Sequence, residues 1–285
     1  MSESRFISIS ELGEIMDILD KETPQGRRDY FEDPDTFFLW WFYYYPESFN
    51  CDLAEFHFEW LYYIACTDLD IMIEGFRSSL KTEITKLYII RSICYKTISY
   101  CVWQSNDSDS SDESVKNISR MLTKSTLVAD YGDFFPFEKK KEDFASSGST
   151  NFDTTNGIKV KAKSTQEKIR GANIYDEDEG TERPDLLILD DIDTTDSVRN
   201  KDIIDKNETK LRQETIGAMS KSKARIIFLG NTIGPDGIVR RFAERIKKDT
   251  KRWKYFWQPL FDKMGNCVWP AFFTPEVIES IKSKE

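Results

Sequence analysis

Four short segments with strand character alternate with stretches of helical spacing, and this order constrains the fold more than any other feature of the chain. The segments are 70–74, 97–103, 186–189 and 224–229. The last two are nearly continuous apolar runs, which is typical of strands buried on both faces of a parallel sheet. Strands separated by helices predict a three-layer α/β fold, with a mainly parallel sheet between two layers of helices.

The loop after the first expected strand has the features of a phosphate-binding loop. It reads Gly-Phe-Arg-Ser-Ser-Leu-Lys-Thr and precedes a helix that should begin near Lys81. Backbone N–H groups at such a helix start surround phosphate oxygens, and the helix dipole favours the anion. Lys81 would reach the β and γ phosphates, and Thr82 would ligate Mg²⁺. The predicted ATP-binding residues are Gly75, Phe76, Arg77, Ser78, Ser79, Leu80, Lys81 and Thr82.

One position of this loop departs from the usual motif, because Leu80 stands where a second glycine belongs. A Cβ atom restricts the backbone there but leaves the N–H group in place. The plain alternative is a chance Lys-Thr pair at an ordinary helix start.

Two carboxylates follow the third expected strand, in the run Leu-Leu-Ile-Leu-Asp-Asp that ends at residue 191. Ligands of open α/β sheets bind at the carboxyl ends of the strands. We therefore assign Asp190 to Mg²⁺ and Asp191 to the orientation of an attacking water molecule. Because Asp191 is one methylene shorter than the glutamate usual at this position, Asp193 is a candidate to assist it. Two acids that merely cap a loop are the alternative interpretation.

The fourth expected strand ends in the small polar residues Gly230, Asn231 and Thr232. In P-loop ATPases a polar side chain at this position can sense the γ-phosphate. Taken alone, the segment favours an ordinary strand-to-helix turn with an Asn or Thr cap.

Composition narrows the class of protein. A net charge of −10 argues against phosphate binding over the whole surface. Eight cations nevertheless crowd residues 240–254, and a solvated helix face or a surface for DNA or a partner explains them equally well. Five cysteines without a CxxC pair and a single histidine argue against a structural zinc site. With no uncharged apolar run of about 18 residues and no secretory signal, neither a membrane span nor export is expected.

The chain divides into three expected parts. Residues 1–45 form a helical segment packed on the core, residues 46–262 form the core, and residues 263–285 begin a lid or linker. Residues 137–155 are charged and small, so a mobile loop is expected there.

Two local features of the core have more than one interpretation. Ser110 and Glu113 have the spacing of a capping box at a helix start. The aromatic stretch around His57 and Trp60 is either part of an adenine pocket or simply packed core.

The order of the motifs resembles the large terminase subunit of tailed phages and related viruses, over roughly His57 to the C-terminus. The residues that carry the resemblance are Arg77 with Lys81-Thr82, Asn156-Gly157, Arg170-Gly171, the run Arg183–Asp191, Gly230–Thr232 and the run from Trp269. Their order and spacing together are specific, although each motif alone is common. The resemblance implies a P-loop NTPase with an extra strand between the phosphate-loop strand and the acidic strand, and a small C-terminal lid.

The resemblance also implies roles for single residues. Arg77 matches the arginine typical of this family's phosphate loop, Asp190 the Mg²⁺ aspartate and Asp191 the catalytic carboxylate. Arg170 matches an arginine finger that acts on a neighbouring subunit, although an ion pair with the acidic run 176–179 would also explain it. The catalytic set is then Lys81, Arg170 and Asp191, and the coupling motif is Gly230, Asn231 and Thr232.

The function implied is an ATP-hydrolysing motor domain that translocates viral double-stranded DNA into a procapsid. Its expected partners are double-stranded DNA, the portal protein, the small terminase subunit and further copies of itself in a ring, with a monomer in isolation. Its expected place is the host cytoplasm, docked transiently on the procapsid. No nuclease activity is expected, because the chain stops just after the ATPase part. A helicase-like DNA translocase and a catalytically silent P-loop scaffold are the alternatives.

Overall fold

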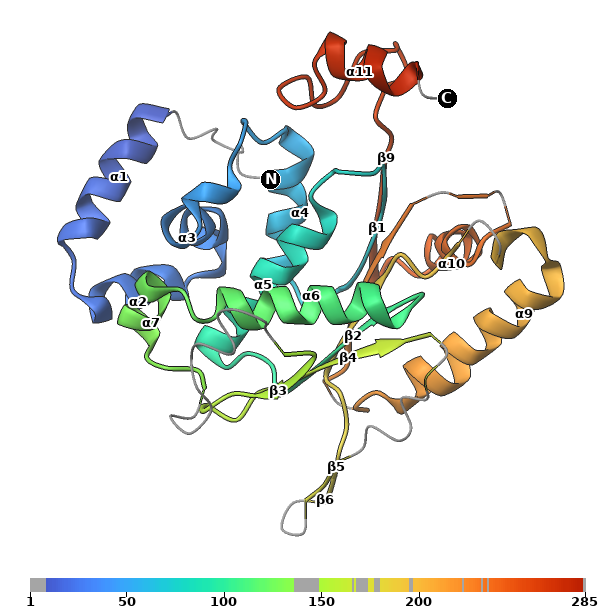
Figure 1. The fold of residues 1–285 in the computed structure, drawn as a ribbon, viewed down its shortest axis with the longest axis horizontal. Coiled ribbons are helices and arrows are strands. Elements are labelled where there is room, and N and C mark those ends of the chain that lie inside the picture. The colour runs from blue at the N-terminus through green and yellow to red at the C-terminus, as the bar shows by residue number, and fades with distance from the viewer. Residues whose placement is uncertain are drawn as a thin grey trace.

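A seven-stranded sheet forms the centre of the molecule (Figure 1). The computed structural model describes residues 9–135, 149–165, 167, 174–176, 180–194, 197–221, 223–231, 233–234 and 236–283. The strands are β1 Asp70–Gly75, β2 Tyr100–Ser105, β3 Asn151–Asp153, β4 Lys159–Ser164, β7 Leu186–Asp190, β8 Arg225–Gly230 and β9 Trp253–Gln258. A separate hairpin pairs β5 Ile174–Asp176 with β6 Gly180–Glu182.

The strand order confirms the predicted fold class. The order is β3-β4-β2-β7-β8-β1-β9, and only β3 runs antiparallel to its neighbour. Strand β8 therefore lies between β1, which leads into the phosphate loop, and the acidic strand β7. This is the extra strand expected of the P-loop fold.

Helices cover both faces of the sheet, as three layers require. The helices are α1 Ile9–Lys21, α2 Pro24–Glu32, α3 Phe37–Tyr44, α4 Glu55–Cys66, α5 Lys81–Tyr95, α6 Ser108–Met121, α7 Ser125–Tyr131, α9 Lys201–Lys210, α10 Ile238–Ile246 and α11 Pro275–Lys282. Shorter turns lie at Pro34–Thr36, Pro46–Ser48, Ser197–Arg199 and Ile216–Ala218, with a π-helical turn at Leu211–Thr215. Within the described residues, no helix combines the length and apolar character needed to cross a bilayer.

Alternate residues of the central strands β1, β2, β7 and β8 enter two different cores. Ile71 and Ile73 of β1 pack with residues of α3 to α6, whereas Met72 packs with residues of α9 and α10. Figure 1 shows α4 to α6 on one side of the sheet and α9 with α10 on the other. This period of two is what a strand buried on both faces must have.

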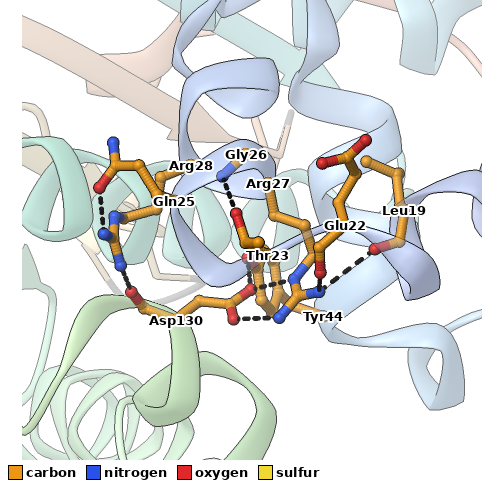
Figure 2. A network of polar contacts seen from close by, with 9 residues as sticks. All are labelled: Leu19, Glu22, Thr23, Gln25, Gly26, Arg27, Arg28, Tyr44 and Asp130. Atoms are coloured by element: carbon orange, nitrogen blue, oxygen red, sulfur yellow. Dashed lines mark hydrogen bonds and ion pairs between the residues drawn. The ribbon is translucent and has the colours of Figure 1, made fainter.

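The N-terminal helices are joined to α7 by a buried carboxylate (Figure 2). Both oxygens of Asp130 accept hydrogen bonds from the guanidinium of Arg27, at 2.6 and 2.7 Å. The hydroxyl of Tyr44 donates a third bond at 2.6 Å, and Arg28 donates to the Asp130 carbonyl. One side chain thereby fixes α2 and α3 to α7.

Two local expectations were wrong. Helix α6 begins at Ser108, because Asp107 accepts the N–H of Ser110 as the helix cap, so Ser110 and Glu113 form no capping box. Residues 151–153, expected in a mobile loop, form β3 against β4. The cation-rich segment 240–254, for which a solvated helix face was one interpretation, contains most of α10 and the first two residues of β9, which pairs with β1.

Candidate functional site

The carboxyl ends of three parallel strands meet at one edge of the sheet. The register places Glu74 of β1 opposite Gly230 of β8, and Leu229 of β8 opposite Asp190 of β7. The phosphate loop, Asn231 and Asp191 each follow one of these ends directly. Segments that are far apart in the sequence thus converge where α/β sheets bind ligands.

Lys81 is the buried cation of this edge. Its Nζ donates to the carbonyls of Phe76 and Gly75 at 2.9 and 3.3 Å, and to Ser79 Oγ at 3.2 Å. A further bond of 3.0 Å reaches Asn231 Oδ1. Burial lowers the pKa of Lys81, and the nearby negative charges of Asp191 and Asp190 oppose that shift.

Asn231 connects the phosphate loop to the acidic pair. Its Oδ1 accepts from Lys81, and its Nδ2 donates to Asp191 Oδ1 at 2.9 Å. The amide therefore lies between the predicted phosphate-binding cation and the predicted catalytic carboxylate. Sequence reasoning on this segment alone favoured an ordinary turn, because nothing local indicates the two distant partners. Thr232, the third residue of the predicted coupling motif, lies outside the described residues.

Thr82 and Asp190 form the predicted Mg²⁺ site. The hydroxyl of Thr82 lies 3.2 and 3.3 Å from the two carboxylate oxygens of Asp190. Burial first, and then the charge of Asp191, raise the pKa of Asp190 to about 7. A hydroxyl and a carboxylate are the oxygen ligands that Mg²⁺ takes alongside phosphates, and its charge would stabilise the ionised acid. These residues fit the cation.

The backbone of the loop fits a phosphate. No described group accepts a hydrogen bond from the N–H groups of Leu80, Lys81 and Thr82, which begin the 15-residue helix α5. Ser78 and Leu80 both have left-handed backbone angles, with φ of 61° and 63°. Unused N–H groups at a helix start are what an anion requires.

The left-handed angle of Leu80 predicts an unusual order of stabilities. Leu80→Gly removes the steric conflict of a Cβ atom, which costs about 1 kcal/mol or more, whereas Leu80→Ala keeps it. Both lose the leucine packing, so the glycine variant should be the more stable by about 1 kcal/mol. Urea unfolding measures the difference. At the exposed helical position Lys206 the alanine variant should be more stable than the glycine variant. If the alanine variant is the more stable at both positions, the left-handed angle of Leu80 does not strain the loop.

Asp193 does not extend the acidic pair into the site. Its two oxygens accept the N–H groups of Ile238 and Val239, at 3.1 and 2.9 Å. The carboxylate thereby caps the start of α10, where a negative charge is favourable. The expectation that Asp193 assists Asp191 is therefore wrong in this arrangement.

His57 contacts the phosphate loop, a contact that sequence reasoning missed. Nε2 lies 3.2 Å from the Ser79 carbonyl, and Nδ1 accepts the Ala54 N–H at 2.9 Å. The ring is fully buried and packs against Trp269 at a centroid distance of 4.6 Å. The position of His57, three residues after Ala54 at the start of a helical stretch, has the spacing of a capping box and could have indicated the bond to the Ala54 N–H. These contacts favour a packed core residue that supports the loop over a residue that lines an adenine pocket.

The same histidine predicts how stability depends on pH. Burial lowers the pKa of His57 from 6.5 to about 4. The unfolded chain therefore binds this proton first, and stability that is present above pH 6.5 is lost as pH falls toward 4. At about 1.4 kcal/mol per pH unit, the full loss is about 3 kcal/mol. Urea unfolding from about pH 7 to 4 should show that the free energy of unfolding of the wild type falls by about this much more than that of His57→Gln. If the two free energies fall in parallel with pH, His57 is not the cause.

Two other predicted features lie elsewhere. Arg170, the predicted finger, is outside the described residues. Six of the eight cations in residues 240–254 form ion pairs within the chain: Arg240–Glu74, Arg241–Asp205, Arg245–Glu208, Lys247–Glu244, Arg252–Asp70 and Lys254–Glu59. These pairs favour a structural segment over a DNA surface.

A cavity of about 420 Å³ lies beside the starts of β8 and β9, at the edge of the sheet opposite the phosphate loop. It is therefore no part of the candidate site. Two of its three arginines, Arg245 and Arg252, form ion pairs with Glu208 and Asp70.

Comparison with known proteins gave structural neighbours only. No protein-family model and no curated protein sequence matches the chain. Similar solved structures include the Phi-28 gp11 DNA packaging motor, with 19% identity and a TM-score of 0.43 over 76% of this chain and 63% of that one. The HK97 bacteriophage large terminase has 13% identity and a TM-score of 0.48 over 82% and 47%. A hypothetical ATP-dependent RNA helicase from Sulfolobus tokodaii has 10% identity and a TM-score of 0.39 over 75% and 55%.

Proposed function

We propose that the chain is the ATP-hydrolysing motor domain of a viral DNA-packaging terminase large subunit. One observation carries the enzymatic part: a buried cation of the phosphate loop and an acid pair from another strand meet through a single amide, that of Asn231. Lys81, Asp191 and the free N–H groups of the loop lie at the same edge of the sheet. A nucleoside triphosphate with Mg²⁺ needs cation, N–H donors and carboxylates in this combination.

The proposed reaction is in-line attack of water on the γ-phosphate of ATP. Lys81 and the loop N–H groups hold the phosphates, and Thr82 with Asp190 would hold Mg²⁺. When bound, that cation neutralises charge on the phosphate oxygens. Asp191 orients the attacking water and takes up its proton as the bond from the γ-phosphorus to the bridging oxygen of ADP breaks. Arg170 of a neighbouring copy supplies further positive charge in this proposal.

The packaging part of the proposal rests on the order of the sequence motifs. Their arrangement from Arg77 to Thr232 resembles the large terminase subunit, and this resemblance supports the role in DNA translocation. The proposed partners are double-stranded DNA, the portal protein, the small terminase subunit and other copies in a ring in the host cytoplasm. Residues 1–45, 46–262 and 263–285 are proposed as helical segment, ATPase core and start of a lid.

The substitution Asp191→Asn tests the proposed chemistry. The amide is nearly the same size but cannot take up a proton, so phosphate release should fall about a hundredfold while binding of Mg-ATP persists. Phosphate release is measured at rising protein concentration, with and without linear duplex DNA. The exposed Asp17→Asn serves as the matched control and should behave as wild type.

Two outcomes of this experiment would decide against the proposal. Unchanged phosphate release in Asp191→Asn would remove that carboxylate from the chemistry. A wild-type protein that binds Mg-ATP but releases no phosphate, even at high protein and DNA concentration, would be a nucleotide-binding scaffold.

A further inference from the structure

The phosphate loop is held from its core side by the imidazole of His57. Nδ1 accepts the N–H of Ala54, so this nitrogen carries no proton. The proton of the neutral ring is therefore on Nε2, which donates to the carbonyl of Ser79 at 3.2 Å. The two bonds together specify one tautomer and one ring orientation.

This bond fixes the direction of one peptide group of the loop. The carbonyl of Ser79 and the N–H of Leu80 belong to the same planar trans peptide and point in opposite directions. A carbonyl held toward His57 therefore directs the Leu80 N–H away from it. No described acceptor takes that N–H, so it is available to an anion.

The loop needs such support, because its backbone is strained. The left-handed angles of Ser78 and Leu80 persist only where their surroundings fix them. If the 79–80 peptide rotated, its carbonyl oxygen would replace the N–H on the side open to the phosphate. An oxygen would repel the phosphate that the N–H attracts.

Aromatic side chains hold the imidazole in place. Phe56 lies at a centroid distance of 4.0 Å and Trp269 at 4.6 Å. Trp269 belongs to the segment after β9 and is itself tied to the Asp52 carbonyl by a hydrogen bond of 2.7 Å. The ring of His57 thus has a fixed position from which to hold the loop.

We propose that His57 is a positioning residue for the phosphate loop: through the carbonyl of Ser79 it orients the Leu80 N–H toward the bound phosphate. The imidazole does not touch the nucleotide. This role rests on the proposed ATP binding and deepens it. The loop has Leu80 where the usual motif has a second glycine, and His57 of α4 would orient the N–H group of that residue.

Two substitutions separate the two hydrogen bonds. In His57→Gln the side-chain amide nitrogen overlays Nε2 of the imidazole, so the bond to Ser79 is kept and the bond to Ala54 is lost. The carbonyl oxygen introduced by His57→Asn overlays Nδ1, so the Ala54 bond is kept and the Ser79 bond is lost. The positioning role predicts Mg-ATP affinity within about twofold of wild type for His57→Gln and about tenfold weaker for His57→Asn.

The readouts are Mg-ATP affinity by titration calorimetry and the unfolding midpoint of each variant. A purely structural role would lower both midpoints without splitting the affinities, and that result would overturn the proposal. If wild type hydrolyses ATP while all three proteins bind it equally, the positioning role fails and the proposed function stands. If wild type does not bind Mg-ATP, both fail.

A measurement on the wild-type protein keeps the test independent of how the variants fold. Amide hydrogen exchange at Leu80 should slow on addition of Mg-ATP, because the N–H then has an acceptor. Unchanged exchange at Leu80 in the presence of saturating Mg-ATP would overturn the assignment.

Discussion

Lys81→Ala should reduce ATP hydrolysis about a thousandfold. In the proposed reaction this ammonium group neutralises charge that grows on the phosphate oxygens, and it acts from a buried place where water does not screen it. Removal of one such preorganised group typically costs about 3–4 kcal/mol of transition-state stabilisation. The measurement is steady-state phosphate release at saturating Mg-ATP, repeated over a range of protein concentrations.

The variant should still fold. Burial lowers the pKa of Lys81, so alanine removes a charge that is costly to bury, and this offsets part of the loss of the hydrogen bonds that the ammonium group donates. The loss of activity would then report chemistry and not unfolding, which the unfolding midpoint checks. The exposed Lys248→Ala is the matched control and should retain full activity. Equal phosphate release in Lys81→Ala and wild type would end the catalytic assignment.

The sheet was largely predictable because its signals are local. A run such as 186–189 can satisfy its apolar side chains only by burial on both faces, and its acidic end must then lie at the sheet edge. The spacing of strands and helices makes neighbouring strands parallel, which brings Lys81 and Asp190 to one edge. Local sequence patterns around Lys81 and around Asp190 were therefore enough to predict these two parts of the site.

The parts that sequence reasoning missed depend on distant partners. Strand β9 lacks the continuous apolar run of the central strands, and it pairs with the edge that β1 offers. Sequence reasoning assigned Asn231 to the coupling motif but not its bonds to Lys81 and Asp191, and it missed the contact of His57 with Ser79. The partners in these contacts lie far apart in the sequence, so local patterns indicate at most one side of each contact.

One further misjudgement has a local cause. The cap of α6 was placed at Ser110, although Asp107 lies three residues earlier and accepts the Ser110 N–H at 2.8 Å. Aspartate and serine are about equally good caps, so spacing alone did not decide between them. The hydrophobic residues of the helix are compatible with either start.

Asp130→Asn should be the most destabilising of the substitutions considered, at about 3–5 kcal/mol. The carboxylate is almost fully buried and receives both N–H groups of the Arg27 fork as well as the hydroxyl of Tyr44 (Figure 2). An amide can accept only on its oxygen, and its NH₂ group would face a guanidinium donor. The cation of Arg27 would then remain largely buried without its counter-charge, which is the costly half of breaking a buried ion pair.

Urea unfolding followed by circular dichroism measures this loss, and two comparisons identify its cause. Lys124→Ala breaks the more exposed pair with Glu47 and should cost less than about 1 kcal/mol. The double variant Arg27→Met with Asp130→Asn removes the stranded cation and should recover a large part of the loss. If the double variant is as unstable as the sum of its single changes, charge pairing is not what Asp130 contributes. The helices α2 and α3 would then be held to α7 by their aromatic packing and by uncharged contacts such as the bond from Trp40 Nε1 to the Tyr131 hydroxyl.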